Sequence, residues 1–234
     1  MIILTRYIES FLRMVYPLTC KGCGEEVFDT QTQLCWRCLE QLPFTGFEKH
    51  AENPVRRIFT GRINVRDAFS TLYFNPQSLA QVVIHRIKYR GDKELGMLMG
   101  EIMGRQMLNT GRFQHLDAIV PLPLNEKKLR MRGYNQSELL ANGMSGILHI
   151  PVNNMAVVRL KHTETQTRKT RIQRWQNVRE VFDLKEGHDL EGKNVLLLDD
   201  VITTGATMES MGQELLKVPG LQLSMASLAY ATSA

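Results

Sequence analysis

Hydrophobic residues recur along this chain in two alternating patterns. Short apolar runs of strand length alternate with longer stretches in which apolar positions recur every three or four residues, the spacing of a helix with one buried face. The short runs predict strands at 67–74, 117–124, 154–160, 178–184, 194–198 and 221–231. The longer stretches predict helices at 76–89, 93–108, 135–148 and 208–217. This alternation predicts an α/β fold whose mostly parallel sheet is covered by helices.

The first residues of the chain predict a helix of a different kind. Apolar positions from Ile3 to Val15 recur at helical spacing. We expect an amphipathic helix packed on the protein, with docking to a membrane surface or a partner as the alternative. Arg6, Glu9 and Arg13 interrupt the apolar run, which makes it a poor secretory signal. No other stretch approaches the roughly 20 apolar residues of a membrane span, so we expect a cytoplasmic protein without a transmembrane span.

Length and composition suit a globular protein with two parts. The chain has 234 residues, of which 43% are hydrophobic and 23% charged, and this is an ordinary globular composition. The length is enough for one medium α/β domain and a small module. A loop from Thr45 to about Gly61 is the expected boundary, because it contains glycines and a proline. We therefore expect an N-terminal module at 1–44 and a larger domain at 45–234.

Four cysteines lie close together in the N-terminal part. Cys20, Cys23, Cys35 and Cys38 form the pattern C-x2-C-x11-C-x2-C. Two short pairs can each turn back on one ion and provide tetrahedral thiolate ligation, so the pattern predicts zinc. Four thiolates leave no open position on the ion, and the zinc is therefore expected to be structural. Redox-active thiols, an Fe–S cluster and core cysteines without a ligand are the alternatives.

The net charge of +5 is unevenly distributed. Residues 159–179 hold seven Arg and Lys residues against one Glu, for a net charge of +6, and residues 125–134 hold four against one, for +3. The rest of the chain therefore carries −4. A mildly acidic protein with two basic stretches suits a local site for phosphates better than a uniformly basic surface.

The most informative segment is NVLLLDDVITTGATM at 194–208. Its apolar start predicts a buried parallel strand, which ends at Asp199 and Asp200 and is followed by a loop and a helix. Ligands of open α/β sheets bind outside the carboxyl ends of the strands. The loop residues 204–207 can offer backbone N–H groups and hydroxyls to a phosphate at a helix N-terminus, and Gly205 permits close approach. Ionised carboxylates only accept hydrogen bonds, so the acid pair suits ribose hydroxyls.

Other nucleotide-binding loops do not fit this segment. No Lys follows Gly205, so it is not a GxxxxGK[ST] loop, and no GxGxxG is present. A plain strand-to-helix turn with Thr caps is the alternative without a ligand. The acid pair followed by TTGAT resembles the motif of type I phosphoribosyltransferases that binds 5-phosphoribosyl-1-pyrophosphate (PRPP). The resemblance implies that PRPP contacts Asp199, Asp200, Val201, Thr203, Thr204, Gly205, Ala206 and Thr207, with the two acids as the catalytic residues.

Further segments narrow the resemblance to one family. They are HRIKYRG at 85–91, PLP at 121–123, RGYNQ at 132–136, Thr163 with Gln166, and Arg174 with Asn177 and Val178. With the cysteines, they make the chain resemble the ComF family over nearly its whole length; Tyr134 stands where Phe is expected. The resemblance implies a type I phosphoribosyltransferase fold with an N-terminal zinc knuckle module. It also implies PRPP binding and a role in DNA uptake during natural transformation, with single-stranded DNA and DNA-uptake proteins as partners.

Two basic regions are candidates for phosphate binding. Arg132 is the preferred ligand because a planar guanidinium binds phosphate oxygens bidentately; Lys88 is a weaker candidate, and a solvated helix face is the alternative. The basic segment 159–179 is predicted to be a loop that closes over the site and stabilises departing pyrophosphate, together with Mg²⁺ bridging pyrophosphate and ribose oxygens. The same segment suits single-stranded nucleic acid through phosphate contacts and base stacking. Its candidate residues are Arg168, Lys169, Arg171, Arg174 and Trp175.

Three functional hypotheses remain open from the sequence. The chain is a ComF-type binding protein in DNA uptake, an active phosphoribosyltransferase acting on a base or amine, or a PRPP-sensing regulator without chemistry. The acid pair and its loop favour PRPP binding in all three, but a fold and a ligand loop do not fix a reaction. No base-recognition hood is recognisable, which counts against ordinary base salvage.

Overall fold

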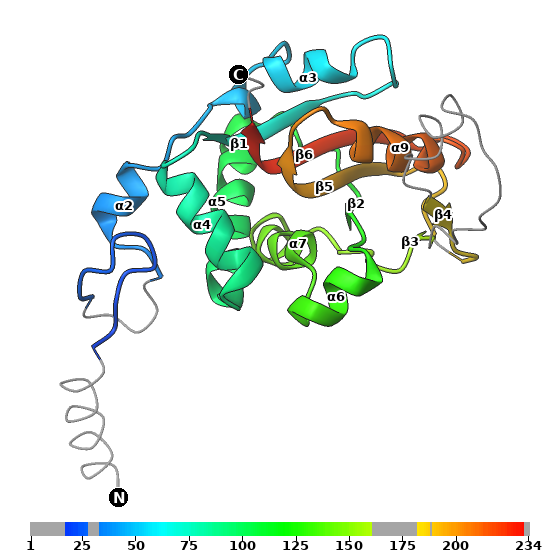
Figure 1. Ribbon diagram of the computed structural model, residues 1–234. Helices are drawn as coiled ribbons and strands as arrows, with labels where there is room; N and C mark the ends of the chain where they lie inside the picture. The colour runs from blue at the N-terminus through cyan, green and yellow to red at the C-terminus, as the bar shows by residue number, and fades with distance from the viewer. Residues whose placement is uncertain (1–16, 28–32, 161–181, 188, 232–234) are drawn as a thin grey trace, which may run out of the picture.

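The central feature of the fold is a four-stranded parallel sheet with strand order β1-β6-β5-β2. The computed structural model describes residues 17–27, 33–160, 182–187 and 189–231 (Figure 1). The sheet consists of β1 (Ala68–Phe74), β2 (Ala118–Pro121), β5 (Asn194–Ile202) and β6 (Gln222–Ala231). Beyond β2, a parallel bridge between Ile119 and Val152 extends the pairing. The expected α/β fold with a mostly parallel sheet is confirmed.

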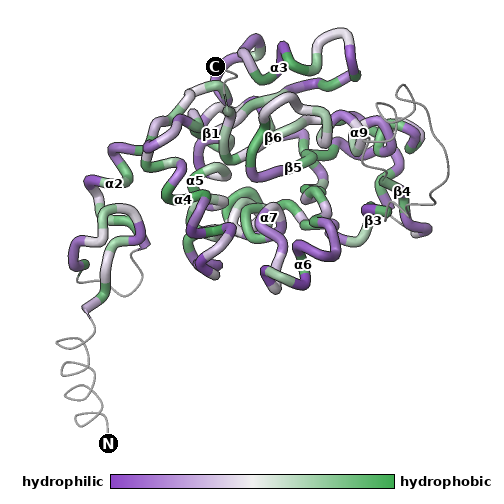
Figure 2. Tube along the Cα trace, viewed as in Figure 1, coloured by the Kyte–Doolittle hydropathy of each residue, from purple (hydrophilic) through white to green (hydrophobic). Residues whose placement is uncertain are grey.

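The two inner strands are buried on both faces and mainly apolar. In β5 the side chains from Val195 to Leu198 have no exposed surface, and in β6 the residues from Leu223 to Ala229 are all buried. Strands of parallel sheets show such continuous apolar runs because helices cover both faces. Hydrophobic positions follow these strands in Figure 2, whereas hydrophilic positions lie mainly on the outer helices and turns.

Helices lie on both sides of the sheet. In Figure 1, α4 (Leu79–Tyr89), α5 (Lys93–Thr110) and α7 (Gln136–Leu148) lie below the sheet, α3 (Pro54–Phe59) lies above it and α9 (Ala206–Leu215) lies to the right. The other described helices are the short α2 (Trp36–Glu40), η1 (Phe47–Lys49) and α6 (Glu126–Arg132). None of the described helices has the length and apolar character needed to cross a bilayer.

Helices α5 and α7 approach each other through glycines. A Cβ atom at Gly100 of α5 would lie 2.1 Å from the Leu140 carbonyl oxygen, and one at Gly143 of α7 would lie 2.1 Å from the Met97 carbonyl oxygen. Any side chain at either position would therefore overlap the backbone of the facing helix. This close packing fixes the first turn of α7, which lies beside the acid pair.

The cysteine module contacts the start of α5. The Gln33 side chain donates a hydrogen bond to Glu94 over 2.9 Å, and the Lys21 ammonium lies 3.8 Å from the Asp92 carboxylate. A Cβ at Gly22 would approach Leu79 at the beginning of α4. The module is thus attached to the same two helices that lead toward the acid pair.

Several sequence-based expectations were wrong in detail. The segment 45–61 was expected to be a loop but contains η1 and α3, because the Asn53 side chain caps α3 by accepting from Val55 and Arg56, and Pro54 occupies its first turn. Helix α6 was considered only as the alternative of a solvated helix face, although the Asn125 side chain caps it in the same way. Both helices begin after an Asn cap. In the segment 45–61, the glycines and the proline had favoured a loop over this signal.

The predicted strand and helix ends also need correction. Strand β5 continues to Ile202, so Asp199 and Asp200 lie within the strand instead of ending it. Helix α9 begins at Ala206, two residues before its expected start. The strand expected at 154–160 is shorter, as β3 (Val157–Arg159). It pairs in a separate antiparallel ladder with β4 (Phe182–Leu184), which is the described part of the strand expected at 178–184. The helix expected from Ile3 to Val15 lies outside the described residues.

Candidate functional site

The two acids near the end of β5 each contact a different helix. The Asp199 carboxylate accepts hydrogen bonds from the Ser137 hydroxyl over 3.1 Å and from the Asp200 backbone N–H over 2.7 Å. The Asp200 carboxylate forms an ion pair with Lys88 at 2.9 Å. Ser137 lies in the first turn of α7, and Lys88 lies in the last turn of α4. The structure therefore places Lys88 beside the acid pair.

The position of Asp199 changes its acidity. Burial raises the pKa of Asp199 to about 7, and the adjacent negative charge of Asp200 acts in the same direction. The Asp200 N–H, the Lys88 charge and the Ser137 hydroxyl oppose this rise without cancelling it. Near neutral pH, Asp199 therefore exchanges a proton readily, and in its protonated form it can donate a hydrogen bond as well as accept one.

The loop after the acid pair lines a small pocket together with the start of α9. The pocket is formed by Asp199 and by residues 201–208. Gly205 has φ of 73°, a left-handed conformation that glycine adopts without strain. The first N–H groups of α9 have no carbonyl partner within the helix and form the positive end of its dipole. The expected residues Thr203, Thr204 and Thr207 lie in this pocket, where hydroxyls and backbone N–H groups converge.

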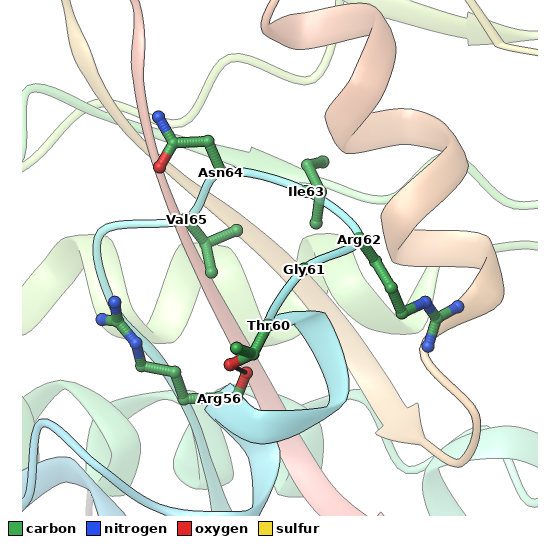
Figure 3. Close-up of a pocket in the computed structure, with 7 residues that line it drawn as sticks. All are labelled: Arg56, Thr60, Gly61, Arg62, Ile63, Asn64 and Val65. Atoms are coloured by element: carbon green, nitrogen blue, oxygen red, sulfur yellow. Dashed lines mark hydrogen bonds between the residues drawn. The ribbon is translucent and has the colours of Figure 1, made fainter.

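The side chain of Arg62, which lies 142 positions before Thr204 in the sequence, holds this loop in place. Arg62 donates to the Thr204 carbonyl over 2.9 Å and to the Ile58 carbonyl over 3.1 Å, and it forms an ion pair with Glu209 of α9. Figure 3 shows Arg62 reaching from the turn after α3 toward the beginning of α9. A Cβ at Gly205 would lie 2.8 Å from Ile58, so the α3 region packs directly against the loop.

The RGYNQ segment connects α6 to α7 and also contacts α4. The Tyr134 hydroxyl donates to the Ile87 carbonyl, and the Asn135 side chain donates to the Leu122 carbonyl over 3.0 Å. The Arg132 guanidinium donates to Gln136 over 2.7 Å and lies 5.1 Å from the Tyr89 ring centroid. Arg132 is thus next to the α4 end that carries Lys88, but it contacts neither acid directly.

Two donors in this segment have no partner among the described residues. The Arg132 Nε and the Gln136 Nε2 atoms are both buried and unpaired, and Gln136 as a whole is 1% exposed. A buried polar group without a partner is costly. These two donors are consistent with an anionic ligand near Arg132.

The basic segment predicted as a closing loop lies mostly outside the described residues. Arg168, Lys169, Arg171, Arg174 and Trp175 are among the residues that are not described. At the start of this segment, the Arg159 guanidinium carbon lies 5.7 Å from the centroid of the Phe182 ring. Arg159 also donates a hydrogen bond to the Pro123 carbonyl over 3.4 Å. The β3–β4 ladder pairs Arg159 with Phe182 beside the PLP sequence, and these are described residues on either side of the undescribed ones.

The four cysteines form a cluster with dimensions that fit a metal ion. Their sulfur atoms all lie within 4.8 Å of one another. Tetrahedral zinc with bonds of about 2.3 Å requires sulfur separations of about 3.8 Å, and the Cys23 and Cys35 sulfurs are 3.8 Å apart. The Cys20 sulfur accepts N–H bonds from Gly22 and Cys35 at 3.3 and 3.2 Å. The cluster fits a metal such as zinc.

The acidity of Cys20 is consistent with a thiolate ligand. Burial acts to raise its pKa, but N–H bonds from Cys35, Cys23 and Gly22 together lower the pKa to about 6. Burial raises the pKa of the Cys38 thiol. One of the four thiols is therefore ready to ionise before a cation arrives, and the positive charge of a bound ion would favour ionisation of the others.

Sequence reasoning missed Ser137 and Arg62. Ser137 directly follows RGYNQ, and its place near the start of a helix beside the acid strand could have indicated its role. Arg62 contacts a residue 142 positions away, and no local pattern announces this contact.

Comparison with known proteins places the chain in a class and then in a family. Residues 135–233 match the phosphoribosyl transferase domain family. A crystal structure of adenine phosphoribosyltransferase is similar at 16% identity and a TM-score of 0.37, over 67% of this chain and 71% of that one. The family match agrees with the parallel sheet and the loop after β5, and the chain has a type I phosphoribosyltransferase fold.

Relatives of known name define the family. Competence protein F of Haemophilus influenzae is 31% identical over 217 residues, which cover 91% of this chain and 84% of that protein. DNA utilization protein YhgH of Escherichia coli O157:H7 is 30% identical over 85% of this chain and 78% of that protein. The chain belongs to the ComF family, as its motifs suggested.

Proposed function

We propose that this chain binds PRPP, or a closely related ribose phosphate, at the carboxyl end of β5. The observation that carries the proposal is the arrangement of Asp199 and Asp200 beside a pocket whose lining includes Thr204 and Thr207 at the start of α9. The acids suit the two ribose hydroxyls, and the loop with the helix N-terminus suits the 5-phosphate. All PRPP contacts of individual residues remain part of this proposal.

The acid pair would exchange partners when the ribose binds. Lys88 occupies one oxygen of Asp200 in the structure. A ribose hydroxyl that bonds to Asp200 competes with this ammonium or shares the carboxylate with it. A displaced Lys88 remains within reach of the pyrophosphate, whose negative charge attracts it. Mg²⁺, when bound, would neutralise part of the negative charge of the pyrophosphate. Among the described residues, Arg132 and Lys88 are the cations proposed to contribute in the same way.

We propose further that the protein acts in DNA uptake and binds single-stranded DNA. The relatives are named for competence and for DNA utilization, and these names support a competence-related role. The assignment of DNA binding to the segment from Arg168 to Trp175 stays a prediction.

The four-cysteine cluster is proposed to hold structural zinc. Its sulfur separations match tetrahedral ligation, and all four positions of the ion would be filled by thiolates. The ion would stabilise the module against α4 and α5. The division of the chain into 1–44 and 45–234 stays a prediction.

Calorimetric titration with PRPP and Mg²⁺ tests the ligand site. The wild type is expected to bind, and the Asp199→Asn/Asp200→Asn protein is expected to lose binding while it remains folded. A matched control replaces Asp189 and Glu191 by Asn and Gln, because these acids flank the opposite end of β5. Absence of binding by the wild type, or equal binding by the acid-pair variant, would refute the proposal.

An active phosphoribosyltransferase is the second candidate function. The raised pKa of Asp199 favours it, because a carboxyl group that titrates near pH 7 can exchange a proton during transfer. Pyrophosphate release on adding a nucleobase or an amine, abolished in Asp199→Asn, would establish turnover. PRPP binding without release for any acceptor would leave a sensing or DNA-related role.

A further inference from the structure

The outer face of α4 combines exposed rings with cations. The rings of His85 and Tyr89 lie one helical turn apart with their centroids 5.0 Å from each other, and Tyr89 is 59% exposed. Arg86 and Arg90 occupy the neighbouring row of the same face. His85, Arg86 and Arg90, together with Gln81 and Val82, line a pocket along the helix.

The charges around this pocket are mainly positive. No acidic residue occurs between Leu79 and Arg90, whereas Arg86, Lys88 and Arg90 do. Asp92 is the acid that faces the pocket end, and it is paired with Arg86 at 3.0 Å and with Lys21 at 3.8 Å. Arg90 forms no ion pair with any described residue, so its charge is available to an anion.

The basic surface continues from α4 onto α6. The Arg132 guanidinium lies over the Tyr89 ring, and Lys127 and Lys128 are exposed residues of the same helix. Within α6 the acid Glu126 lies 3.8 Å from Arg130. Arg132 of α6 thus adjoins the ring-bearing end of α4, whose last turn also carries Lys88 beside the acid pair.

From this combination we infer that the α4 face, defined by Gln81, Val82, His85, Arg86, Tyr89 and Arg90, binds single-stranded nucleic acid. Exposed rings stack on unpaired bases, and neighbouring arginines contact the phosphates between them. An acidic peptide would use the arginines but would gain little from two rings. The inference rests on the proposed DNA-related function, and it assigns the contact to residues other than those of the segment from Arg168 to Trp175.

The surface also adjoins the proposed PRPP site through α4 itself. Tyr89 follows Lys88, which is paired with Asp200, and both residues belong to the last turn of α4. Nucleic acid on the outer side of this turn and PRPP on its inner side would therefore contact adjacent residues of the same helix.

Fluorescence anisotropy with a labelled oligo-dT of roughly 20 nucleotides, longer than the about 4–16 nucleotides of a typical single-strand site, tests the inference. Tyr89→Ala is expected to weaken binding by at least about fivefold, because one stacked base is lost, whereas Tyr89→Phe keeps the ring and should bind like the wild type. Arg90→Glu is expected to weaken binding at low salt and to reduce the slope of log affinity against log salt by about 0.7 per lost phosphate contact.

The matched control is Arg105→Glu. Arg105 is an exposed residue of α5 without an ion pair to any described residue, so its reversal changes the net charge equally at another place. It should bind oligo-dT as the wild type does, apart from the small uniform effect of charge. An abasic oligonucleotide should bind more weakly than oligo-dT and should not distinguish Tyr89→Ala from the wild type.

The outcomes separate this inference from the function on which it rests. A wild type that binds no oligonucleotide at low salt refutes both the DNA-binding proposal and the α4 surface. A wild type that binds, with Tyr89→Ala and Arg90→Glu unchanged, refutes only the α4 surface. Equal competition by polyglutamate and by abasic DNA would show a general anion surface and overturn the inference. PRPP titration of Arg90→Glu, expected to match the wild type, confirms that this variant is folded.

Discussion

Alanine is expected to have opposite effects at two glycines of the same helix. Gly143 and Gly146 both lie within α7, and helix propensity favours alanine over glycine by ~1 kcal/mol at each position. A Cβ at Gly143 would lie 2.1 Å from the Met97 oxygen and 2.9 Å from the Glu101 nitrogen, whereas a Cβ at Gly146 has nothing within 4 Å. Gly143→Ala should therefore destabilise the protein and Gly146→Ala should stabilise it.

The size of the effect follows from the atoms in contact. The Cβ at Gly143 must move at least 0.9 Å away from the Met97 oxygen to pass from 2.1 Å to the 3.0 Å below which Cβ contacts essentially do not occur. The Met97 oxygen is a backbone atom, and the position of a Cβ is fixed by its own backbone. No rotamer change can therefore relieve the contact. Overpacking costs ~1–3 kcal/mol, and the rigid contact favours the upper end, which leaves a net loss of about 2 kcal/mol after the gain in propensity.

Thermal unfolding followed by far-UV circular dichroism checks this prediction. In a chain of this length 1 kcal/mol shifts Tm by ~2–4 °C. Gly143→Ala is thus expected to lower Tm by roughly 4–8 °C and Gly146→Ala to raise it by roughly 2–4 °C. The scans should use the metal-loaded protein at one heating rate, with urea midpoints as a second measure. Equal stability of the two variants would refute the close contact between α5 and α7.

Three further predictions concern the two sites. Asp199→Asn should raise Tm relative to the wild type at pH 8 but not at pH 4, because the folded-state pKa of about 7 exceeds the unfolded value of about 3.9 and wild-type stability falls as the pH rises between them. Arg62→Met should weaken PRPP binding by about two- to tenfold, measured by calorimetry, because the Thr204 carbonyl loses one hydrogen bond. Cys35→Ser should lower the metal content measured by atomic absorption and destabilise the cysteine module.

Each of these three predictions would be contradicted by a specific result. A difference between Asp199→Asn and the wild type that does not vary between pH 4 and pH 8 would contradict the raised pKa of Asp199. If Arg62→Met bound PRPP as the wild type does, the loop would not depend on this arginine; Arg57→Met, at an exposed position of α3, serves as the control. One ion per chain retained by Cys35→Ser would show that the ligand set is different.

The sequence predicted those parts of the molecule whose signals are local. The apolar run of β5, the acid pair and the loop are consecutive, and their order along the chain is also their order in space. The cysteine pattern worked for the same reason, because each short pair contains its own turn. Helical periodicity located α5 and α7 within a few residues at their ends.

Contacts between distant segments could not be predicted in this way. Arg62 reaches Thr204 and Ser137 reaches Asp199 only after the sheet has formed, and nothing in the local sequence specifies either pair. Glycine has a low helix propensity, but Gly100 of α5 is required by the close approach of the α7 backbone. In the segment 45–61, composition indicated a loop, whereas burial of Val55 and Phe59 favours the short helix α3.

The central position of β6 has a consequence for how the protein is made. Strand β6 lies between β1 and β5, yet it follows all the other strands along the chain. Ala68 of β1 pairs with Met225, 157 residues later, so β1 leaves the ribosome long before its partner exists. The sheet can close only after β6 has emerged, and until then the apolar faces of β1 and β5 are exposed to aggregation and chaperones. Shortening the chain before Gln222 would therefore separate β1 from the β5–β2 pair instead of removing an edge strand.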